Sequence, residues 1–498
     1  MPRILSIDQG TTSSRAIVVD ERGAILGMGQ QPFRQQFPQP GWVEHDPEEI
    51  WSSTETAIAG ALGQAGVAPR ELAAVGITNQ RETVVVWERS SGKAVHNAIV
   101  WQDRRTADHC EALRGAGHEE MVRGLTGLTL DPYFSGTKLS WLLRQDSELR
   151  RRARAGELAA GTVDSWLLWK LTGGRAHLTD FTNASRTLLF DIRQRRWDEG
   201  LCDLFEVPRG MLAEAQPSGT PFGRTATEVI GAELPIHAIA GDQAAALFGQ
   251  ACFSPGDAKN TYGTGCFLLA NAGTDMKLSQ HRLLTSCAAT VADEPVEYAL
   301  EGSVFVAGSL VQWLRDELGI IQRSDEIEGL AASVPDSGGV TIVPAFTGLG
   351  APYWDPHARG AILGLTRGTS RAHIARAALE AIALSSAELI EAMAGDLGAP
   401  LTELRADGGA SANDLLMQMQ ADFSGIPVSR PANTETTAMG AAYLAGLGAG
   451  VWDSREEVAA LVAPDRRFLP ATAGEERARR LASWRTEVGR VLEGRGGR

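Results

Sequence analysis

A glycine turn between two β-rich runs near the start of the chain restricts the possible folds more than any other feature. The run 4–7 is followed by Asp8-Gln9-Gly10-Thr11-Thr12-Ser13-Ser14 and then by the apolar run 15–19. Two such runs joined by small residues predict a β-hairpin. Its tip exposes backbone N–H groups and hydroxyls, which are suitable donors for polyphosphate oxygens. An ordinary surface hairpin is the alternative interpretation, because short motifs also match by chance.

The elements around this hairpin predict an α/β domain. Asp8 comes directly after the run 4–7, as the last residue of the first strand, where its carboxylate is placed to hold Mg²⁺ through oxygen or water. Strands are expected at 4–7, 15–20 and 24–31, and a helix is expected to begin at Pro47, with Asp46 as its cap and Glu49 completing a capping box. Further strands are expected at 72–78 and 83–88. Three strands, a crossover helix and another strand are typical of an α/β domain.

The second half of the chain repeats this order of elements. A strand at 258–261, the glycine turn Tyr262-Gly263-Thr264-Gly265 and an apolar strand at 266–269 predict a second hairpin. A one-faced helix follows, with its apolar positions at Ile374, Ala378, Ala381, Ile382, Leu389 and Met393. Two such hairpins predict two copies of one fold facing each other across a cleft. Because 498 residues exceed one ordinary core, we expect two domains, residues 1–251 and 252–498.

Charge and cysteine content exclude several classes of protein. The net charge is −14 and no long basic run occurs, so we expect neither nucleic acid nor an anionic membrane as a partner. No uncharged apolar run reaches membrane-spanning length, so we do not expect an integral membrane protein. The chain enters a strand without a charged-then-apolar leader, so we do not expect secretion either. The five cysteines are odd in number and lack metal-like spacing. Reduced thiols in a cytoplasmic protein are the simplest account.

The segment Asp407-Gly408-Gly409-Ala410-Ser411 is a candidate nucleotide contact. It follows a short strand at 404–406 and precedes a helical pattern that contains Leu415, Leu416, Met419 and Phe423. A glycine pair at such a turn lets a flat ligand such as adenosine lie against the backbone, with Asn413 as a polar contact at the helix start. A tight turn with a helix cap is the alternative.

Arg81 and Glu82 form a candidate polyol site. A polyol needs a donor and an acceptor for adjacent hydroxyls, and this pair at a strand end offers both. Adjacent strand residues point to opposite faces, so the pair must lie in a turn to converge; a surface salt bridge is the alternative. Trp101 is either core or an apolar wall for a substrate carbon chain.

Asp242 is the candidate general base. It ends the apolar strand Ile239-Ala240-Gly241 beside the expected domain boundary, where its carboxylate can accept a hydroxyl proton as that hydroxyl attacks a γ-phosphate. A simple turn residue is the alternative. The chain contains no GxxxxGK[ST], HExxH, GxSxG or helix-opening GxGxxG motif, and its histidines form no ligand-spaced cluster.

Taken together, these motifs resemble the FGGY carbohydrate kinases, and within them the members that act on glycerol. The similar segments run nearly end to end: 8–15, 40–47, 77–83, 97–101, 131–138, 161–164, 182–186, 240–250, 259–267, 344–368 and 407–413. The segment Asn79-Gln80-Arg81-Glu82 differs from the matching segment of the pentulose kinases.

The resemblance implies an α/β protein of two ribonuclease H-like (actin-like ATPase) domains with a ligand cleft between them. It also implies Mg²⁺-dependent phosphoryl transfer from ATP to glycerol, giving sn-glycerol 3-phosphate and ADP, in a homodimer or homotetramer. The glycerol contacts that it implies are Arg81, Glu82, Trp101, Tyr133, Asp242, Gln243 and Phe267, with Asp242 as the general base and Asp8 as the metal ligand. The nucleotide contacts that it implies are Thr11, Thr12, Ser13, Arg15, Thr264, Gly308, Gln312, Gly409 and Asn413.

Two other functions fit parts of the sequence. A kinase for another polyol or a ketose would share the phosphate hairpins, but would differ at Arg81, Glu82 and Trp101. A non-catalytic ATP-binding regulator on the same fold would lack the base or the hairpins, and both are present here. A substrate panel separates these hypotheses.

One departure from the family predicts altered regulation. Some bacterial members bind fructose 1,6-bisphosphate through a Gly-Gly-Thr-Arg loop at a tetramer interface, whereas this chain reads Gly231-Ala232-Glu233-Leu234. Because the Glu233 carboxylate repels a phosphate that an arginine would bind, we expect weak or absent inhibition by this anion. Residues 222–234 also contain no histidine, so activation by phosphorylation of a histidine there is not expected. A titration of turnover with fructose 1,6-bisphosphate tests the first point, and an inhibition constant in the micromolar range would contradict it.

Overall fold

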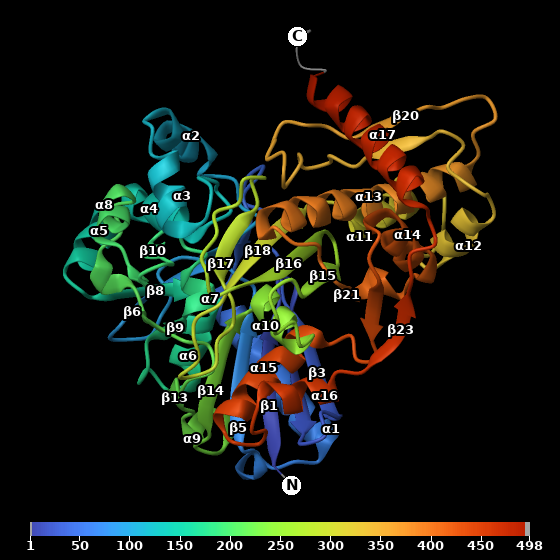
Figure 1. Cartoon of the computed structure of the whole chain (residues 1–498). Helices are drawn as coiled ribbons and strands as arrows, with labels where there is room; N and C mark the ends of the chain where they lie inside the picture. Colours follow the sequence, from blue (N-terminus) through green and yellow to red (C-terminus); the bar gives the residue numbers. More distant parts are fainter. Residues whose placement is uncertain (1, 494–498) are drawn as a thin grey trace.

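The computed structural model describes residues 2–493, and two large mixed sheets form its centre, one from each half of the chain (Figure 1). The first sheet has the order β13-β14-β5-β1-β2-β3, and the second has the order β17-β18-β16-β15-β21-β22-β23. The strands of the first are β1 (Arg3–Gln9), β2 (Ser13–Asp20), β3 (Ile25–Pro32), β5 (Ala74–Asn79), β13 (Gly223–Arg224) and β14 (Pro235–Gly241). Those of the second are β15 (Ala258–Tyr262), β16 (Cys266–Gly273), β17 (Leu284–Cys287), β18 (Tyr298–Val304), β21 (Leu404–Asp407), β22 (Val428–Pro431) and β23 (Pro464–Phe468).

The two sheets repeat one pattern of strand pairing. In the first, β1 pairs antiparallel with β2 and parallel with β5, which in turn pairs parallel with β14. In the second, β15 pairs antiparallel with β16 and parallel with β21, which pairs parallel with β22. The prediction of two copies of one fold, each opened by a glycine-tipped hairpin, is therefore confirmed.

Helices cover both faces of the first sheet. Leu5 and Ile7 of β1 pack on one side with α1 (Pro47–Ala65) and α6 (Val163–Leu171). Ile4 points to the other side, toward α10 (Asp242–Gly249) and α15 (Thr436–Gly448). Ser6 shares that side, and its Oγ donates to the carbonyl of Ala438 at 2.6 Å. Burial of each aliphatic side chain of β1, such as Ile4, Leu5 or Ile7, stabilises the fold by about 1.5–3 kcal/mol.

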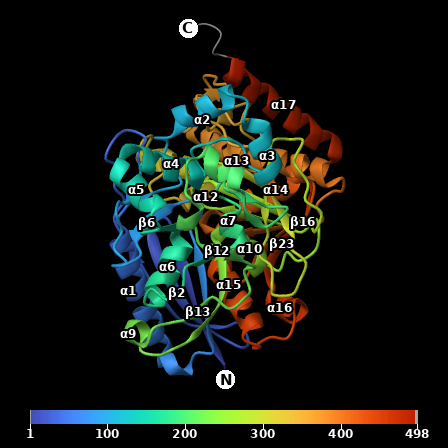
Figure 2. The ribbon, with the colours of Figure 1, turned by 90° about the vertical axis from the view of Figure 1, so that its left-hand side faces the viewer.

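The helix α15 returns from the second half of the chain to the first sheet. Figures 1 and 2 show α15 and α16 (Arg455–Leu461) at the end of the molecule opposite α17 (Gly474–Glu493). Helices α10 and α15 cross closely at two glycines. A Cβ on Gly440 would lie 1.8 Å from the carbonyl oxygen of Ala245, and one on Gly249 would lie 2.0 Å from that of Thr436. The halves are therefore joined by packed helices as well as by the chain at the expected boundary.

A further sheet and several helices are formed mainly by the segment between β5 and β14. The sheet has four strands: β4 (Glu44–His45), which precedes β5 in the chain, and then β7 (Ala98–Ile99), β6 (Val84–Glu88) and β8 (Leu158–Thr162) from that segment. The helices of the same region are α2 (Ala107–Gly115), α3 (Glu119–Thr126), α4 (Ser135–Gln145), α5 (Ser147–Arg154), α7 (Phe181–Ala184), α8 (Glu199–Leu204) and α9 (Thr227–Ile230). Two small ladders pair β9 (Leu178–Asp180) with β12 (Glu214–Gln216) and β10 (Phe190–Asp191) with β11 (Arg196–Trp197).

Helices also pack around the second sheet. The longest is α13 (Arg371–Leu397), and the expected apolar positions from Ala378 to Met393 are buried along it. The other helices are α11 (Gly308–Asp316), α12 (Glu326–Ala332) and α14 (Asp414–Ser424), and a small ladder pairs β19 (Thr341–Val343) with β20 (Ala361–Leu363). Between residues 2 and 493, no helix combines the length and the apolar character needed to cross a membrane.

One local expectation is wrong. Helix α1 begins at Pro47 and Asp46 caps it, accepting from the backbone N–H of Glu48, as predicted. Glu49, however, does not complete a capping box. Its carboxylate accepts hydrogen bonds from the backbone N–H and the Nε of Arg34 instead, because the chain preceding α1 lies beside the first turn of this helix.

The crossing of α10 and α15 generates a stability prediction. We expect Gly440→Ala to lower the free energy of unfolding by about 1–3 kcal/mol, because the added methyl group must push the two helices apart. Urea unfolding measures this change. The matched control is Gly489→Ala, inside α17 with no atom within 4 Å of the new Cβ, which should stabilise by about 0.5–1 kcal/mol through helix propensity. Equal effects of the two substitutions would contradict the close-crossing argument.

Candidate functional site

The tip of the first hairpin lies beside the carboxyl end of β5. Gly10 closes the turn, its N–H donating to the carbonyl of Ser13 at 3.0 Å. The Gln80 amide donates to Gln9 Oε1 at 3.0 Å and to the carbonyl of Gly10 at 3.1 Å. His45 is fully buried behind Gln80, and its Nε2 lies 2.6 Å from Gln35 Oε1. Neighbouring polar side chains therefore hold the hairpin in one place.

The hydroxyls of this hairpin are accessible. Thr12 is exposed, and Thr11 and Ser13 are half-buried. Thr11 Oγ1 accepts a hydrogen bond from Trp101 Nε1 at 2.9 Å, and Ser13 Oγ accepts one from Gln30. Both hydroxyls retain their own hydrogen for an incoming acceptor.

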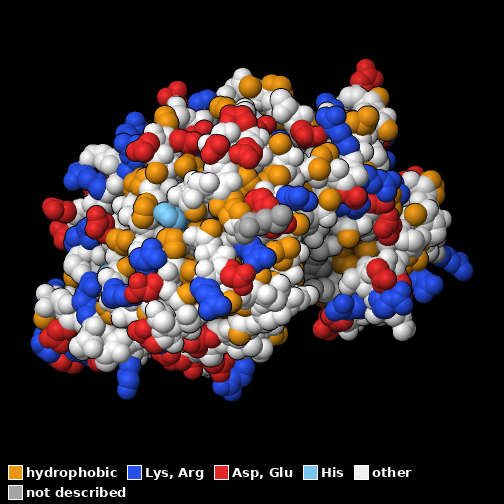
Figure 3. All heavy atoms as spheres, turned by 90° about the horizontal axis from the view of Figure 1, so that it is seen from below, with side chains coloured by type: hydrophobic (Ala, Val, Ile, Leu, Met, Phe, Trp, Pro, Cys, Tyr) orange, Lys and Arg blue, Asp and Glu red, His pale blue; other side chains and the backbone are white. Residues whose placement is uncertain are grey.

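A cavity of about 590 Å³ lies between this hairpin and the second half of the chain. The surface is also hollowed between the larger and the smaller part of the molecule in the view from below (Figure 3). Three predicted residues line the cavity, Asp8, Arg15 and Gly409. Its other lining residues are Thr261, Asp407, Gly408, Ser411, Ala412, Arg430, Pro431, Ala432, Thr434, Glu435, Thr437 and Asp465.

The charged groups of the cavity come from both halves. Arg15 forms an ion pair with Glu435, across the cavity from its own strand. Burial raises the pKa of Asp8 to about 7, although the nearby charge of Arg15 lowers it. Asp407 Oδ2 accepts from the Thr436 hydroxyl, whereas its buried Oδ1 has no hydrogen-bond partner within residues 2–493. The cavity is thus lined by two arginines, Arg15 and Arg430, and by four carboxylates, those of Asp8, Asp407, Glu435 and Asp465.

The tip of the second hairpin is attached to the start of α11. The carbonyl of Thr264 accepts from the backbone N–H groups of Ala307 and Ser309, at 2.8 and 3.1 Å. Gly308 donates to the carbonyl of Gly263 at 3.0 Å, and a Cβ on Gly308 would lie only 2.5 Å from that oxygen. Gln312 is exposed one helical turn further along. The structure therefore places Thr264, Gly308 and Gln312 together, outside the lining of the described cavity.

The glycine pair of the second half lies where the sequence predicts. Strand β21 ends at Asp407, a short 3₁₀ turn runs from Gly409 to Ala412, and α14 begins at Asp414. Asn413 caps α14, its Oδ1 accepting from the backbone N–H of Leu416 at 2.8 Å. The helix-cap interpretation of Asn413 is therefore correct for this oxygen.

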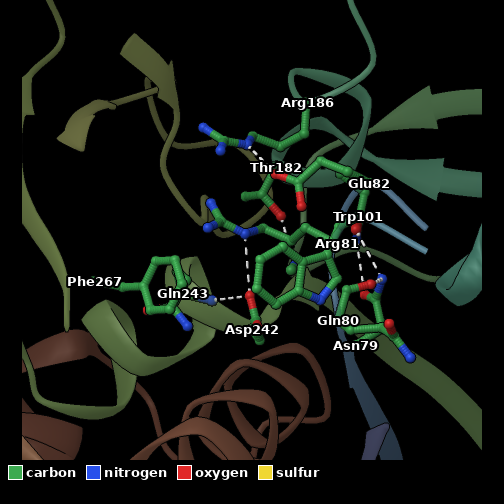
Figure 4. A network of polar contacts seen from close by, with 12 residues as sticks. Asn79, Gln80, Arg81, Glu82, Trp101, Thr182, Arg186, Asp242, Gln243 and Phe267 are labelled. Atoms are coloured by element: carbon green, nitrogen blue, oxygen red, sulfur yellow. Dashed lines mark hydrogen bonds and ion pairs between the residues drawn. The ribbon is translucent and has the colours of Figure 1, made fainter. Parts of the chain in front are cut away.

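Arg81 and Glu82 converge through a turn, as their proposed role requires. β5 ends at Asn79 and β6 begins at Val84, and between them Glu82 adopts a left-handed backbone conformation with φ of 61°. Asp242 follows the neighbouring strand β14. The Nε of Arg81 lies 3.0 Å from Asp242 Oδ1, an ion-pair contact, and the backbone N–H of Gln243 donates to the same oxygen at 2.7 Å (Figure 4).

Aromatic rings surround this polar group. The Trp101 ring centre lies 5.6 Å from that of Tyr133 and 6.2 Å from that of Phe267, in edge-to-face arrangements. Tyr133 is buried, and burial raises the pKa of its hydroxyl, so it stays protonated and can donate. Phe267 belongs to β16, so the second half completes the wall. The structure thus brings the seven residues predicted as polyol contacts into one place.

Two buried charged residues of this place were assigned no role from the sequence. Arg186 donates from Nε to Glu82 Oε1 at 2.6 Å, and from Nη2 to Glu301 Oε1 at 3.1 Å (Figure 4 shows the first of these bonds). Glu301 also binds Arg81 through both of its oxygens, at 2.6 and 3.0 Å. Burial raises the pKa of Glu301, but Arg186 and Arg81 outweigh this effect and hold it at about 2.

Lys259 is a further buried charge without a role assigned from the sequence. Its Nζ donates to Gln243 Oε1, to Thr261 Oγ1 at 2.9 Å and to the carbonyl of Phe267 at 3.2 Å. Burial lowers the pKa of Lys259 to about 8. A sequence signal for these residues exists: Lys259 and Glu301 are single charges inside strands that are otherwise uncharged and mostly buried.

The chain matches a known family over most of its length. The model of the N-terminal domain of the FGGY family of carbohydrate kinases matches residues 3–249, and that of the C-terminal domain matches residues 258–449. The chain is 59% identical to a glycerol kinase of Aromatoleum aromaticum over 491 residues, covering 99% of each protein. It is 57% identical to a glycerol kinase of Deinococcus radiodurans, covering 98% of this chain and 97% of that protein.

Solved structures share the fold. The crystal structure of Plasmodium falciparum glycerol kinase with ADP is 36% identical and superposes with a TM-score of 0.93, covering 99% of this chain and 98% of that one. A ligand-bound xylulose kinase from Lactobacillus acidophilus, 20% identical, superposes with a TM-score of 0.88 over 100% of this chain and 99% of that one. This second similarity concerns the fold alone.

The buried imidazole behind the first hairpin generates a pH prediction. Burial lowers the pKa of His45 from 6.5 to about 4, so below pH 6.5 the unfolded chain takes up a proton there that the folded protein does not. The free energy of unfolding should therefore fall as the pH drops from about 6.5 to about 4. Urea unfolding measured at several pH values in this range should show that the free energy of unfolding depends less steeply on pH in His45→Gln than in the wild type. The exposed His357→Gln is the control and should keep the wild-type slope; equal slopes for all three proteins would refute the assignment.

Proposed function

The chain belongs to the FGGY family of carbohydrate kinases, and we propose that it transfers the γ-phosphoryl group of ATP to glycerol, giving sn-glycerol 3-phosphate and ADP. One observation carries this proposal: Asp242 lies in ion-pair contact with Arg81 in the same group of residues as the clustered rings of Trp101, Tyr133 and Phe267, which together would form the polyol pocket. A pocket with a carboxylate, a guanidinium and apolar walls fits a short polyol. Relatives named glycerol kinase, 57–59% identical over nearly the full chain, support the choice of glycerol among polyols.

The polar groups of the pocket complement three adjacent hydroxyls. Arg81 supplies N–H donors, and Glu82 supplies a carboxylate that is held by Arg186 through one oxygen. Within residues 2–493 the other oxygen of Glu82 makes no hydrogen bond, so it is available to a hydroxyl. Tyr133 offers its hydroxyl, and Trp101 and Phe267 provide apolar surface for the carbon chain.

Asp242 is proposed to take the proton of the attacking hydroxyl. Its side chain is 30% exposed, so it reaches the cleft from the end of β14. The Gln243 N–H donates to Oδ1, and the Arg81 Nε lies 3.0 Å from the same oxygen in an ion-pair contact, so Oδ2 is the oxygen that would accept the proton. Proton transfer to this carboxylate accompanies the attack of the hydroxyl oxygen on the terminal phosphorus.

The nucleotide is proposed to occupy the described cavity and to extend beyond its lining to the tips of the two hairpins. Thr11, Thr12, Ser13 and Arg15 would bind the β- and γ-phosphates, with Thr264 from the other side. Gly308, Gln312, Gly409 and Asn413 would hold the rest of the nucleotide. Positioning and charge neutralisation are the main requirements of phosphoryl transfer, and these groups supply both.

The cavity also fits a magnesium ion. No group of three or more metal-binding side chains occurs among the described residues, but Mg²⁺ in kinases usually takes one or two carboxylates together with substrate phosphates and water. Asp8 lines the cavity and would be the ligand; Asp407 adds a second carboxylate whose Oδ1 is unpartnered. A bound Mg²⁺ would offset the negative charge of the phosphates. We also propose a cytoplasmic location, on the ground of the unpaired cysteines, and a homodimeric or homotetrameric state, as the family resemblance implies.

A coupled assay of ADP release tests the proposed function. The purified protein, given ATP, should release ADP in the presence of glycerol and Mg²⁺, and should not do so after removal of either. Xylulose serves as the competing substrate. Faster turnover with xylulose than with glycerol would overturn the choice of substrate, and turnover unchanged by chelation would overturn the role of the metal.

Replacement of the base generates a second test. We expect Asp242→Asn to lower turnover about 100- to 10,000-fold, because the amide cannot accept the proton. Nucleotide affinity, measured by calorimetry, should stay nearly unchanged, since Asp242 does not line the described cavity. Asp453→Asn, an exposed substitution after α15, is the control and should keep wild-type turnover. A near-normal rate for Asp242→Asn would refute the assigned role.

A further inference from the structure

Arg186 and Glu301 form a buried ion pair that no step of the proposed reaction uses. Their side chains are 0% and 1% exposed. Arg186 follows the short helix α7 in the first half of the chain, whereas Glu301 belongs to β18 of the second sheet. The pair therefore joins the two halves directly behind the proposed polyol pocket.

This pair contacts three of the proposed polyol-binding residues. Glu301 binds Arg81 in a bidentate manner, Nη1 to Oε2 at 2.6 Å and Nη2 to Oε1 at 3.0 Å. Arg186 donates to the carboxylate of Glu82 at 2.6 Å. The Arg186 guanidinium also lies 5.4 Å from the centre of the Tyr133 ring, within the range of a cation–π contact.

The bidentate contact determines how Arg81 faces a substrate. A guanidinium has five N–H donors in one plane. Two of them, one on each Nη, bind the two oxygens of Glu301, which fixes the plane and leaves one N–H on each Nη. The Nε lies 3.0 Å from Asp242 Oδ1 in an ion-pair contact but makes no hydrogen bond within residues 2–493. A planar group held by such a bidentate contact presents its remaining Nη donors in a restricted direction.

Arg186 fixes the acceptor in the same way. Its Nε holds one oxygen of Glu82, its Nη1 donates to Ser286 Oγ at 2.9 Å, and its Nη2 binds Glu301. Ser286 lies on β17, so two adjacent strands of the second sheet support this arginine. The donor Arg81 and the acceptor Glu82 are thus oriented by a common support.

We propose that Arg186 and Glu301 are positioning residues that set the spacing of donor and acceptor for the polyol, and that this spacing depends on the contact between the two halves. The inference rests on the proposed phosphorylation of glycerol. A purely stabilising role explains the arrangement less well, because a buried ion pair often contributes no more than an apolar pair of similar volume.

The experiment compares the Michaelis constants of glycerol and ATP in Glu301→Gln. Loss of the charge should release Arg81 from its bidentate contact and raise the KM for glycerol about 10- to 100-fold, while the KM for ATP stays at the wild-type value. Glu301→Asp, which keeps the charge on a shorter side chain, should recover part of the glycerol affinity. An equal rise of both constants, or an unchanged KM for glycerol, would overturn the proposal.

Two further variants make the result decisive. Glu297→Gln is the matched control, a carboxylate-to-amide change just before β18 that pairs with Arg455 and touches none of the polyol residues, and it should leave both constants unchanged. Ser286→Ala removes one hydrogen bond to Arg186 and serves if Glu301→Gln does not fold; it should raise the KM for glycerol about 3- to 10-fold. An unchanged KM in folded Ser286→Ala would then count against the proposal.

The activity of the wild-type protein distinguishes a failure of the proposed function from a failure of the proposed positioning role. If it releases no ADP with glycerol, the proposed function fails, whatever the variants do. If it is active and Glu301→Gln retains the wild-type KM for glycerol, only the positioning role fails. Thermal unfolding of each variant with and without glycerol adds a second readout: glycerol should raise the melting temperature of the wild type more than that of Glu301→Gln.

Discussion

Pairing of buried charges where the two sheets meet is the constraint on which the rest of the site depends. Arg81 and Arg186 come from the first half, and both find their counter-charge in Glu301 of the second half. Removing one partner of such a buried pair costs about 3–5 kcal/mol, so the halves are held in the relation that keeps these charges paired. The same arrangement of the two halves places Phe267 against Trp101 and brings Glu435 into its ion pair with Arg15.

The repeated strand order explains why the chemistry lies at this junction. In open α/β sheets, ligands bind beyond the carboxyl ends of parallel strands, because loops from neighbouring strands meet there. In the first sheet, β5 leads to Arg81 and β14 leads to Asp242, while in the second sheet β21 leads to the glycine pair at Gly408. The hairpin tips lie next to these ends. The close crossing of α10 and α15 packs the first sheet against a helix of the second half.

Local patterns predicted much of this arrangement, since each depends on neighbours in the chain. Short-range geometry is sufficient for the hairpins at Gly10 and Gly263 and for the cap of α1 at Asp46. It is also sufficient for the turn that lets the adjacent side chains of Arg81 and Glu82 converge. The expected capping box failed at Glu49 because a segment outside the helix, at Arg34, competes for the same carboxylate. A short motif cannot report a competitor that arrives from elsewhere in the fold.

The sequence by itself determined the two hairpins, the class of fold, the family and the set of residues available for the site. Only the tertiary structure decided which partners the charged side chains would find: Glu301 meets Arg81 and Arg186, Glu435 meets Arg15, and Lys259 donates to the amide oxygen of Gln243. The physical reason is the distance along the chain over which each interaction acts. Strand periodicity and turn chemistry act between residues a few positions apart, whereas the partner of a buried charge is selected by burial and distance between segments that are brought together only when both sheets have formed.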